Sequence, residues 1–552
     1  MNRFLSGAAL AACLAPVAAA QSNVIPGTDV SLGILDDLSS FGHTGTLPTG
    51  NNALSMSTTS CNLGSVNVPW LAPMDEDHPL ISFLMTRVEP DQGRMIQISN
   101  YSYLKHGFFA LSNSQCIPCQ NPSPGTFLGV GCSDTYSQFN NSDNFWLGPA
   151  EEIDPWLGTW DPVCSFFDAG LNPTPPFDCD GNRSFSSSQA NSLGTLGNRM
   201  LVSDADLSVE GAGYFYAGYY VIKGEPEANR ENNAAWRRVT GNFGSGGPFG
   251  GGPQWNFNNA TPQTFGTVLA GWPGATITSG VNGTDDGRVY VGTKVTGPDK
   301  NGIYHYEYAF HNRDNNKAVG AVRFPYCDGG TVQNPGFHDV DQNAGNDWTS
   351  AVNGTELSFS TGNNPLRWNS IYNVWFDSTA PPVEGSITLD AFFPGPGASS
   401  FEIPAMVPSS GYLAHVGDGC TEFASAGDLI PNGQPTLGNN SFAVALTSDV
   451  PAATPVLLYG SGQSANLPLG ACTLYLGGAI GPEILQLGLS ATDSNGDANF
   501  PVGIPNDGTL EGVDFFLQAA LVTGNLTAPI FATGELSDAI RVTLGDNVGS
   551  CN

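Results

Sequence analysis

Basic residues are scarce in this sequence. Lys and Arg together number 18 against 50 Asp and Glu, which gives a formal net charge of −32. A surface this acidic repels phosphate backbones and anionic lipid headgroups, so we expect no nucleic-acid partner. The same charge can attract cations such as Ca²⁺, although it also serves simply to keep a protein soluble.

Long apolar runs are also missing after the first 20 residues. No later stretch approaches about 18 uninterrupted apolar residues, so the sequence predicts no transmembrane span. The opening MNRFLSGAALAACLAPVAAAQ combines a basic start at Arg3, an apolar stretch and small residues up to Ala20. This pattern predicts a signal peptide over residues 1–20. A lipoprotein box ending at Cys13 competes with it, but the apolar segment before Cys13 is very short. We therefore expect a secreted, extracellular protein, and attachment to the cell surface stays open.

Several catalytic signatures are absent. The chain has no G-x-S-x-G elbow, no HExxH, and no Walker A or GxGxxG phosphate loop. Only seven histidines occur in the whole sequence, which argues against multi-histidine metal clusters. Glycosidases escape this exclusion because they need only two suitably separated carboxylates, which no linear motif reveals.

Glycine and proline are abundant and charged residues are few. Gly (69) and Pro (40) make up 109 of 552 residues, about a fifth, while hydrophobic residues supply 40%. Frequent Gly and Pro residues break helices and favour short strands. A chain of this length also requires several hydrophobic cores. We predict an all-β, multi-domain protein made of antiparallel β-sandwich-like modules, with a loop-rich, disulfide-containing N-terminal domain.

Ten of the 11 cysteines remain if Cys13 leaves with the signal peptide, and an even number in an exported chain predicts up to five disulfides. Cys116 and Cys119 have CxxC spacing, but no second CxxC or paired His follows at zinc distance. Plausible local pairs are Cys164 with Cys179 and Cys420 with Cys472, although connectivity does not follow from sequence. The ten positions are 61, 116, 119, 132, 164, 179, 327, 420, 472 and 551.

Composition divides the chain into three regions. Residues 21–240 form a loop-rich β domain with six cysteines, and the Gly-rich segment from Asn242 to Pro253 looks like a linker or long loop. Residues 255–400 alternate as a central β-sandwich, and a Pro-rich stretch around 391–410 marks the next boundary. Residues 411–549 contain short, regularly spaced strands, which predict a C-terminal β-sandwich module.

The C-terminal region also carries recognisable motifs. The runs 435–439 (PTLGN), 457–460 (LLYG), 470–474 (GACTL), 504–506 (IPN) and 542–545 (VTLG) resemble a β-sandwich module appended to many exported bacterial proteins. Earlier runs, 58–62 (TTSCN), 104–108 (LKHGF), 129–134 (GVGCSD) and 336–341 (GFHDVD), are similar to those of uncharacterised secreted bacterial proteins that carry this module. The resemblance implies export and modular architecture and brings no established activity.

A strand over residues 303–311 presents two different faces. Tyr304, Tyr306, Tyr308 and Phe310 share the face expected in the core, opposite His305, Glu307 and His311. His305 and Glu307 would lie roughly 6–7 Å apart, within reach of a shared ion, whereas His311 would lie about 20 Å from His305. A solvated or hydrogen-bonded face is the simpler interpretation. A metal site using His305, Glu307 and His338 is the weaker alternative.

The segment 336–347 is the most suggestive for metal binding. Asp339, Asp341, Asn343 and Asp347 offer oxygen ligands at nearly alternate positions, as calcium loops do. Gly345 comes one place later than an EF-hand requires, and Ser350 stands where the bidentate Glu should be, so an Asx-rich turn is the competing interpretation. The runs 178–182 (DCDGN) and 493–497 (DSNGD) offer similar oxygens, which turn chemistry explains without any ion.

These observations favour a secreted, non-catalytic structural or binding protein, with calcium as the candidate stabilising ion and an extracellular glycan or matrix as the candidate partner. One alternative is an exported glycan- or polymer-degrading hydrolase with its site in the N-terminal domain. There, Glu151, Glu152 and Asp154 stand near tryptophans 146, 156 and 160, for which burial is the simpler explanation. Another alternative is a metal-dependent oxidase that uses histidines 106, 305, 311 or 338.

Overall fold

The computed structural model describes residues 23–545 except 91–92, 102, 176, 247–251, 327–331, 342, 354–355, 410, 418–419, 421–426, 449, 470–471, 480–482, 488–490 and 523–533. The expected signal peptide and the cysteines Cys327 and Cys551 lie outside these residues.

The regular structure of the described chain is almost entirely antiparallel strand, which confirms the predicted all-β class. Its four α-helices have only four to six residues, and in the described residues no helix has the length and apolarity needed to cross a membrane. The helices are α1 (Gln138–Asn141), α2 (Phe166–Ala169), α3 (Ser187–Ser192) and α4 (Asp204–Leu207), with 3-10 turns η1 (Asn144–Trp146), η2 (Ala150–Glu152), η3 (Glu227–Asn229), η4 (Val268–Gly271) and η5 (Gly508–Leu510).

Two sheets form the N-terminal region. The first has the order β1 (Val30–Thr44), β2 (Asn51–Asn62) and β12 (Met200–Ser203), with β8 (Ser133–Tyr136) on β2. The second has the order β15 (Pro253–Asn259), β14 (Ala234–Ser245), β13 (Gly213–Val221), β4 (Leu80–Val88), β6 (Leu104–His106) and β9 (Leu147–Gly148), with β16 (Thr264–Phe265) on β14 and β5 (Met95–Gln97) on β4. Short ladders join β3 (Val68–Pro69) to β7 (Phe127–Leu128) and β10 (Ile153–Asp154) to β11 (Thr159–Trp160). A large apolar core that includes Leu32, Met56 and Tyr216 fills the space between the two sheets.

The break expected between Asn242 and Pro253 is a hairpin instead of a linker. Strands β14 and β15 pair from Val239 with Asn259 to Ser245 with Pro253. Gly244, which the composition places in a linker or long loop, is a strand residue that pairs with Gln254. The N-terminal sheet therefore extends through β16, and the central sheets begin at β17.

The central region is a two-sheet sandwich. One sheet has the order β17 (Thr276–Val281), β18 (Arg288–Thr296), β19 (Tyr304–Asn312), β24 (Ser370–Ser378) and β21 (Val332–His338). The other has the order β22 (Thr349–Asn353), β23 (Glu356–Ser360), β20 (Val319–Pro325), β25 (Pro382–Ala391) and β26 (Ser400–Pro408). As the alternation in β19 predicts, Tyr304, Tyr306, Tyr308 and Phe310 all enter the core between these sheets.

The C-terminal region is a smaller sandwich. Its main sheet has the order β27 (Tyr412–Val416), β36 (Gly534–Thr543), β35 (Asp514–Val522), β30 (Thr454–Gly460) and β33 (Glu483–Leu487). A second sheet contains β28 (Asp428–Asn432), β29 (Ala443–Thr447) and β34 (Ala498–Pro501), and β31 (Gly462–Leu469) pairs with β32 (Cys472–Gly477). Apolar clusters cover both faces of the main sheet, one with Leu517 and one with Phe516.

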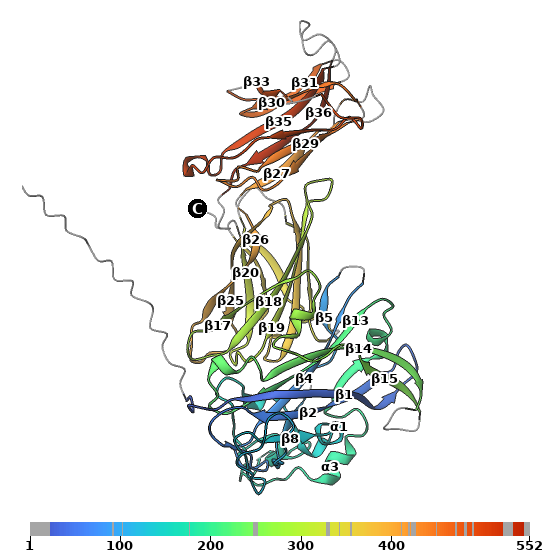
Figure 1. The fold of residues 1–552 in the computed structure, drawn as a ribbon, viewed down its shortest axis with the longest axis vertical. Helices are drawn as coiled ribbons and strands as arrows, with labels where there is room; N and C mark the ends of the chain where they lie inside the picture. Colours follow the sequence, from blue (N-terminus) through green and yellow to red (C-terminus); the bar gives the residue numbers. More distant parts are fainter. Residues whose placement is uncertain are drawn as a thin grey trace, which may run out of the picture.

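The N-terminal and central regions share a core of their own. Leu84, Phe215 and Trp236 of the N-terminal sheet pack with Tyr290 and Ile371 of the central sheet in one buried cluster. Figure 1 shows the three regions following one another along the longest axis of the molecule. The sequence predicts a solvated or hydrogen-bonded surface for the face of β19 that carries Glu307. In the structure this face lies against the N-terminal region.

Four disulfides join cysteines of the described residues. Cys61 pairs with Cys116 and Cys119 with Cys132, so the two CxxC cysteines belong to separate bridges and not to a metal site. The predicted local pairs are confirmed by the bridges Cys164–Cys179 and Cys420–Cys472.

Candidate functional site

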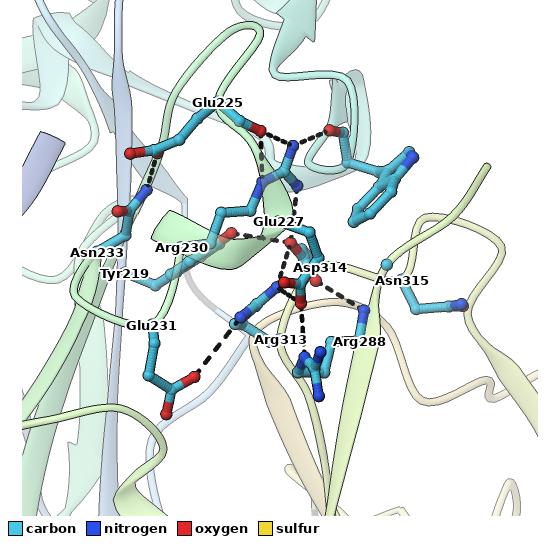
Figure 2. Close-up of polar contacts among 12 residues, drawn as sticks. Tyr219, Glu225, Glu227, Arg230, Glu231, Asn233, Arg288, Arg313, Asp314 and Asn315 are labelled. Carbon is cyan, nitrogen blue, oxygen red and sulfur yellow. Dashed lines mark hydrogen bonds and ion pairs between the residues drawn. The ribbon is translucent and has the colours of Figure 1, made fainter. Parts of the chain in front are cut away.

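The most concentrated chemistry in the described residues is a buried charge network between the N-terminal and central sheets. It forms where the segment around η3, between β13 and β14, meets the turn that follows β19. Figure 2 shows arginine and acidic side chains linked there by hydrogen bonds and ion pairs. They belong to Arg230, Arg288, Arg313, Glu227, Glu231 and Asp314.

Asp314 is the centre of this network and has no exposed surface. Its Oδ2 accepts hydrogen bonds from Arg230 (2.9 Å), Tyr219 (3.0 Å) and Arg313 (3.1 Å), and its Oδ1 accepts the Arg288 backbone N–H at 2.8 Å. Burial alone would raise the pKa of Asp314, but the two guanidinium groups of Arg313 and Arg230 hold that pKa down at about 2.

The two buried arginines also bind groups other than Asp314. Arg230 donates to the carbonyl oxygens of Glu225 (2.9 and 3.1 Å) and Trp156 (2.7 Å) and lies over the Trp156 ring. Arg313 donates to Glu227 at 2.9 Å, and Arg288 donates to the same carboxylate oxygen at 2.6 Å. The opposite charges are matched, and Arg230, Arg313 and Asp314 at the centre are buried, so this network is suited to joining two regions and not to proton transfer.

A second buried ion pair crosses the same junction and involves a predicted metal ligand. Arg94, which follows β4, donates two hydrogen bonds of 2.6 and 2.7 Å to the two carboxylate oxygens of Glu307 on β19. The guanidinium also lies 3.6 Å from the centre of the Trp375 ring. Glu307 is 2% exposed, so its carboxylate serves Arg94 rather than an open coordination site.

His305 is brought next to Glu307, as the strand pattern predicts. Its Nε2 lies 3.3 Å from Glu307 and its Nδ1 lies 2.6 Å from Asp377. Hydrogen bonding to Glu307, opposed by partial burial and assisted by Asp377, raises the pKa of His305. These hydrogen bonds and the Arg94 ion pair account for the polar atoms of both side chains, and metal binding by His305, Glu307 and His338 stays a prediction. His311 lies apart from this pair, with its Nδ1 2.8 Å from the Thr267 hydroxyl.

His338, Asp339 and Asp341 do lie together, in a polar pocket of about 240 Å³ that Asp206 of the N-terminal region also lines. Burial lowers the pKa of His338, and its buried Nε2 has no hydrogen-bond partner. The sequence could not place Asp206 here, because it belongs to a distant helix, α4.

The oxygen-rich loop after His338 is held by its own hydrogen bonds. Asp339 accepts from the Asp341 N–H (2.9 Å), Asp341 from the Asn343 N–H (2.6 Å), and Asn343 from the Gly345 N–H (3.2 Å). The second carboxylate oxygen of Asp339 accepts from the Asn364 amide at 2.5 Å. These bonds are those of an Asx-rich turn, and calcium binding by Asp339, Asp341, Asn343 and Asp347 stays a prediction.

An apolar-lined pocket opens beside the junction. Its volume is about 620 Å³, and Phe215, Trp236 and three prolines line it together with Glu89 and Lys294 near its polar side. The Trp236 ring packs against Phe215 with a centroid distance of 5.7 Å, and its buried Nε1 has no hydrogen-bond partner. Aromatic walls with a few polar groups are typical of small-ligand sites.

Two of the three tryptophans near Glu151, Glu152 and Asp154 are buried. Trp156 and Trp160 are 2% and 3% exposed, as the simpler explanation predicts, whereas Trp146 is only partly buried. Glu152 accepts the Trp160 indole N–H at 3.4 Å and the Phe166 backbone N–H at 2.6 Å. His106 is buried against His78, with Nδ1 and Nε2 2.8 Å apart. Glu151 lines a pocket of about 280 Å³ together with Lys317, Arg367 and Trp368.

Comparison with known proteins assigns no family. No family model and no curated protein matches this chain. Among solved structures, the BcpA major pilin subunit of Bacillus cereus is similar at 11% identity, over 64% of this chain and 85% of the pilin, with a TM-score of 0.18. A DUF4466-family protein from Parabacteroides merdae is similar at 10% identity, over 46% of this chain and 98% of that protein, with a TM-score of 0.17.

Proposed function

We propose that this chain is an exported, non-catalytic structural or binding protein of the extracellular space. The observation that carries the proposal is the junction between the first two regions, where two buried ion-pair systems and a shared apolar core fix one sandwich against the next. A spacer or scaffold needs such fixed joints, whereas an enzyme needs an accessible, unpaired acid, base or nucleophile. The four disulfides support export, because bridges of this kind persist in oxidising compartments.

The binding partner we propose is an extracellular glycan or matrix polymer, and its candidate site is the pocket of Phe215 and Trp236. Sugar rings present C–H faces that pack on aromatic rings, and the polar side chains that line the pocket can bind hydroxyls. Gly271 forms part of the wall, and a Cβ there would lie 2.9 Å from Phe215 and 3.1 Å from Trp236. The absence of a side chain at this position lets the η4 turn pack directly against the two rings.

One experiment tests both parts. The purified, disulfide-intact chain is incubated with a panel of extracellular polysaccharides, and both retention on the polymer and release of soluble sugar are measured. We expect retention of at least one polymer without product, and a loss of retention in Trp236→Ala. Phe265→Ala is the matched control, because Phe265 is 49% exposed on the neighbouring β16 but does not line the pocket. Release of sugar product by the wild type would refute the non-catalytic proposal.

A further inference from the structure

The side chains of three aspartates, Asp168, Asp178 and Asp180, lie close together in the N-terminal region. Asp168 lies in α2, and Asp178 and Asp180 flank Cys179. One ligand oxygen from each lies within 4.8 Å of the others, and in the described part of the chain no other such group of three or more acidic, His or Cys side chains occurs. The Cys164–Cys179 disulfide holds the two segments together.

The carboxylate of Asp168 is only half satisfied by the protein. Its Oδ2 accepts the backbone N–H groups of Cys164 (2.8 Å) and Gly181 (3.1 Å), one from each side of the disulfide loop. Its Oδ1 is buried and has no hydrogen-bond partner, in a residue with 0% exposure. Buried polar atoms are nearly always satisfied, so this carboxylate oxygen beside other carboxylates has the capacity to bind a further partner.

The charges at this position are unbalanced as well. None of the three aspartates forms an ion pair with a Lys, Arg or His of the described residues. Carboxylates this close repel each other, and water can screen only the exposed pair, Asp178 and Asp180. A bound cation would remove the repulsion and complete the shell of the buried Asp168 oxygen.

We propose that Asp168, Asp178 and Asp180 bind a calcium ion. The donor set is oxygen only, which suits a hard cation and not zinc or copper. Two of the carboxylates lie on a short turn that a disulfide anchors. Ca²⁺ accepts an irregular shell of oxygen ligands such as this rigid turn would offer, whereas Mg²⁺ requires a nearly ideal octahedron. The DCDGN run alone reads as a turn, and Asp168 is what the structure adds to it. This site does not depend on the proposed function.

Calcium titration of the disulfide-intact full chain tests the site. After EDTA treatment and desalting, CaCl₂ is titrated by calorimetry and thermal unfolding is recorded in parallel. We expect one site with a Kd of about 0.1–1 mM, the range of extracellular modules, and a rise in Tm with CaCl₂. Asp178→Asn and Asp180→Asn should each weaken binding at least about tenfold, because affinity follows ligand charge. Both residues are exposed, so these variants should fold.

Asp493→Asn is the control, because Asp493 is an exposed turn aspartate outside the three-aspartate group, and its calcium affinity should equal that of the wild type. No heat and no Tm shift up to about 5 mM CaCl₂, several times the expected Kd, would overturn the proposal. Loss of binding in Asp341→Asn but not in Asp178→Asn or Asp180→Asn would move the ion to the 339–347 loop and also overturn it. An equal response to MgCl₂ would overturn the assignment to calcium.

Discussion

Arg94 and Glu307 lie 213 positions apart in the sequence and form a two-point hydrogen-bonded ion pair inside the molecule. The arginine comes from the N-terminal region and the glutamate from the central sandwich. Each side chain is almost inaccessible to water, at 9% and 2% exposure. Through this contact, the polar face of β19 becomes part of the interface between the N-terminal and central regions.

Removal of that arginine should weaken the junction severely. Arg94→Ala leaves Glu307 buried without its partner, and breaking a buried pair in this way typically costs about 3–5 kcal/mol. We expect a matching fall in the free energy of unfolding, measured by urea denaturation. The control is Arg323→Ala, whose partner Asp390 is about one-third exposed and whose loss should cost less than about 1 kcal/mol. Equal effects for the two variants would show that the Arg94 pair is no stronger than a surface contact.

Asp314 should make the protein sensitive to acid. Its folded-state pKa of about 2 lies below the ordinary value of 3.8, so its stabilising contribution is complete above about pH 4 and is lost as the pH falls from 4 to 2. Asp314→Asn should therefore lower the unfolding free energy at pH 7 and change it much less near pH 2. Urea midpoints at the two pH values measure the difference. An unchanged gap between variant and wild type at both values would contradict the assignment.

The buried pair of His78 and His106 gives a second pH dependence in a higher range. Burial lowers the pKa of His78 from 6.5 to about 4 and that of His106 well below 6.5. The unfolded chain binds these protons first, so stability falls as the pH drops from about 6.5 to 4. His78→Gln should flatten this slope, measured as the urea midpoint against pH.

His415 provides the comparison of opposite sign. Its hydrogen bond to Asp538, with Nδ1 2.6 Å from the carboxylate, raises the pKa of His415 above 6.5. Its contribution is complete below pH 6.5 and is lost as the pH rises through the folded-state pKa. His415→Gln should therefore reduce stability more at pH 5 than at pH 9. The same trend for both histidine variants would show that one assignment is wrong.

The Cys420–Cys472 bridge should stabilise the C-terminal sandwich alone. It closes 52 residues, for which chain-entropy arguments give about 4 kcal/mol. The double variant Cys420→Ser with Cys472→Ser should unfold the C-terminal region at lower temperature and leave the transition of the first two regions in place. Calorimetry resolves the two transitions, and a downward shift of both would indicate coupling that this bridge does not explain.

Local pattern predicts the class and several strands of this fold but not its junctions. The alternation of Tyr304, Tyr306, Tyr308 and Phe310 places β19 and its core face correctly, because strand periodicity is encoded in neighbouring residues. The partners of Glu307 and Asp314 are Arg94 and Arg230, which no local spacing connects to them. Asp168 was missed for the same reason, since a disulfide and a helix turn bring it to Asp178 and Asp180. Sequence alone identifies candidate metal sites only where the ligands follow one another closely, as in the Asx-rich loop at 339–345.

The apolar cluster shared by the first two regions limits how this chain can be cut. A fragment that stops at Phe265 would leave Phe215 and Trp236 facing water, and a fragment that starts at Thr276 would do the same to Tyr290 and Ile371. We expect each fragment to aggregate by itself, because each would expose an apolar sheet surface to water. The smallest fragment that we expect to fold independently therefore contains both the N-terminal and the central region. Expression trials should truncate the chain only after Pro408.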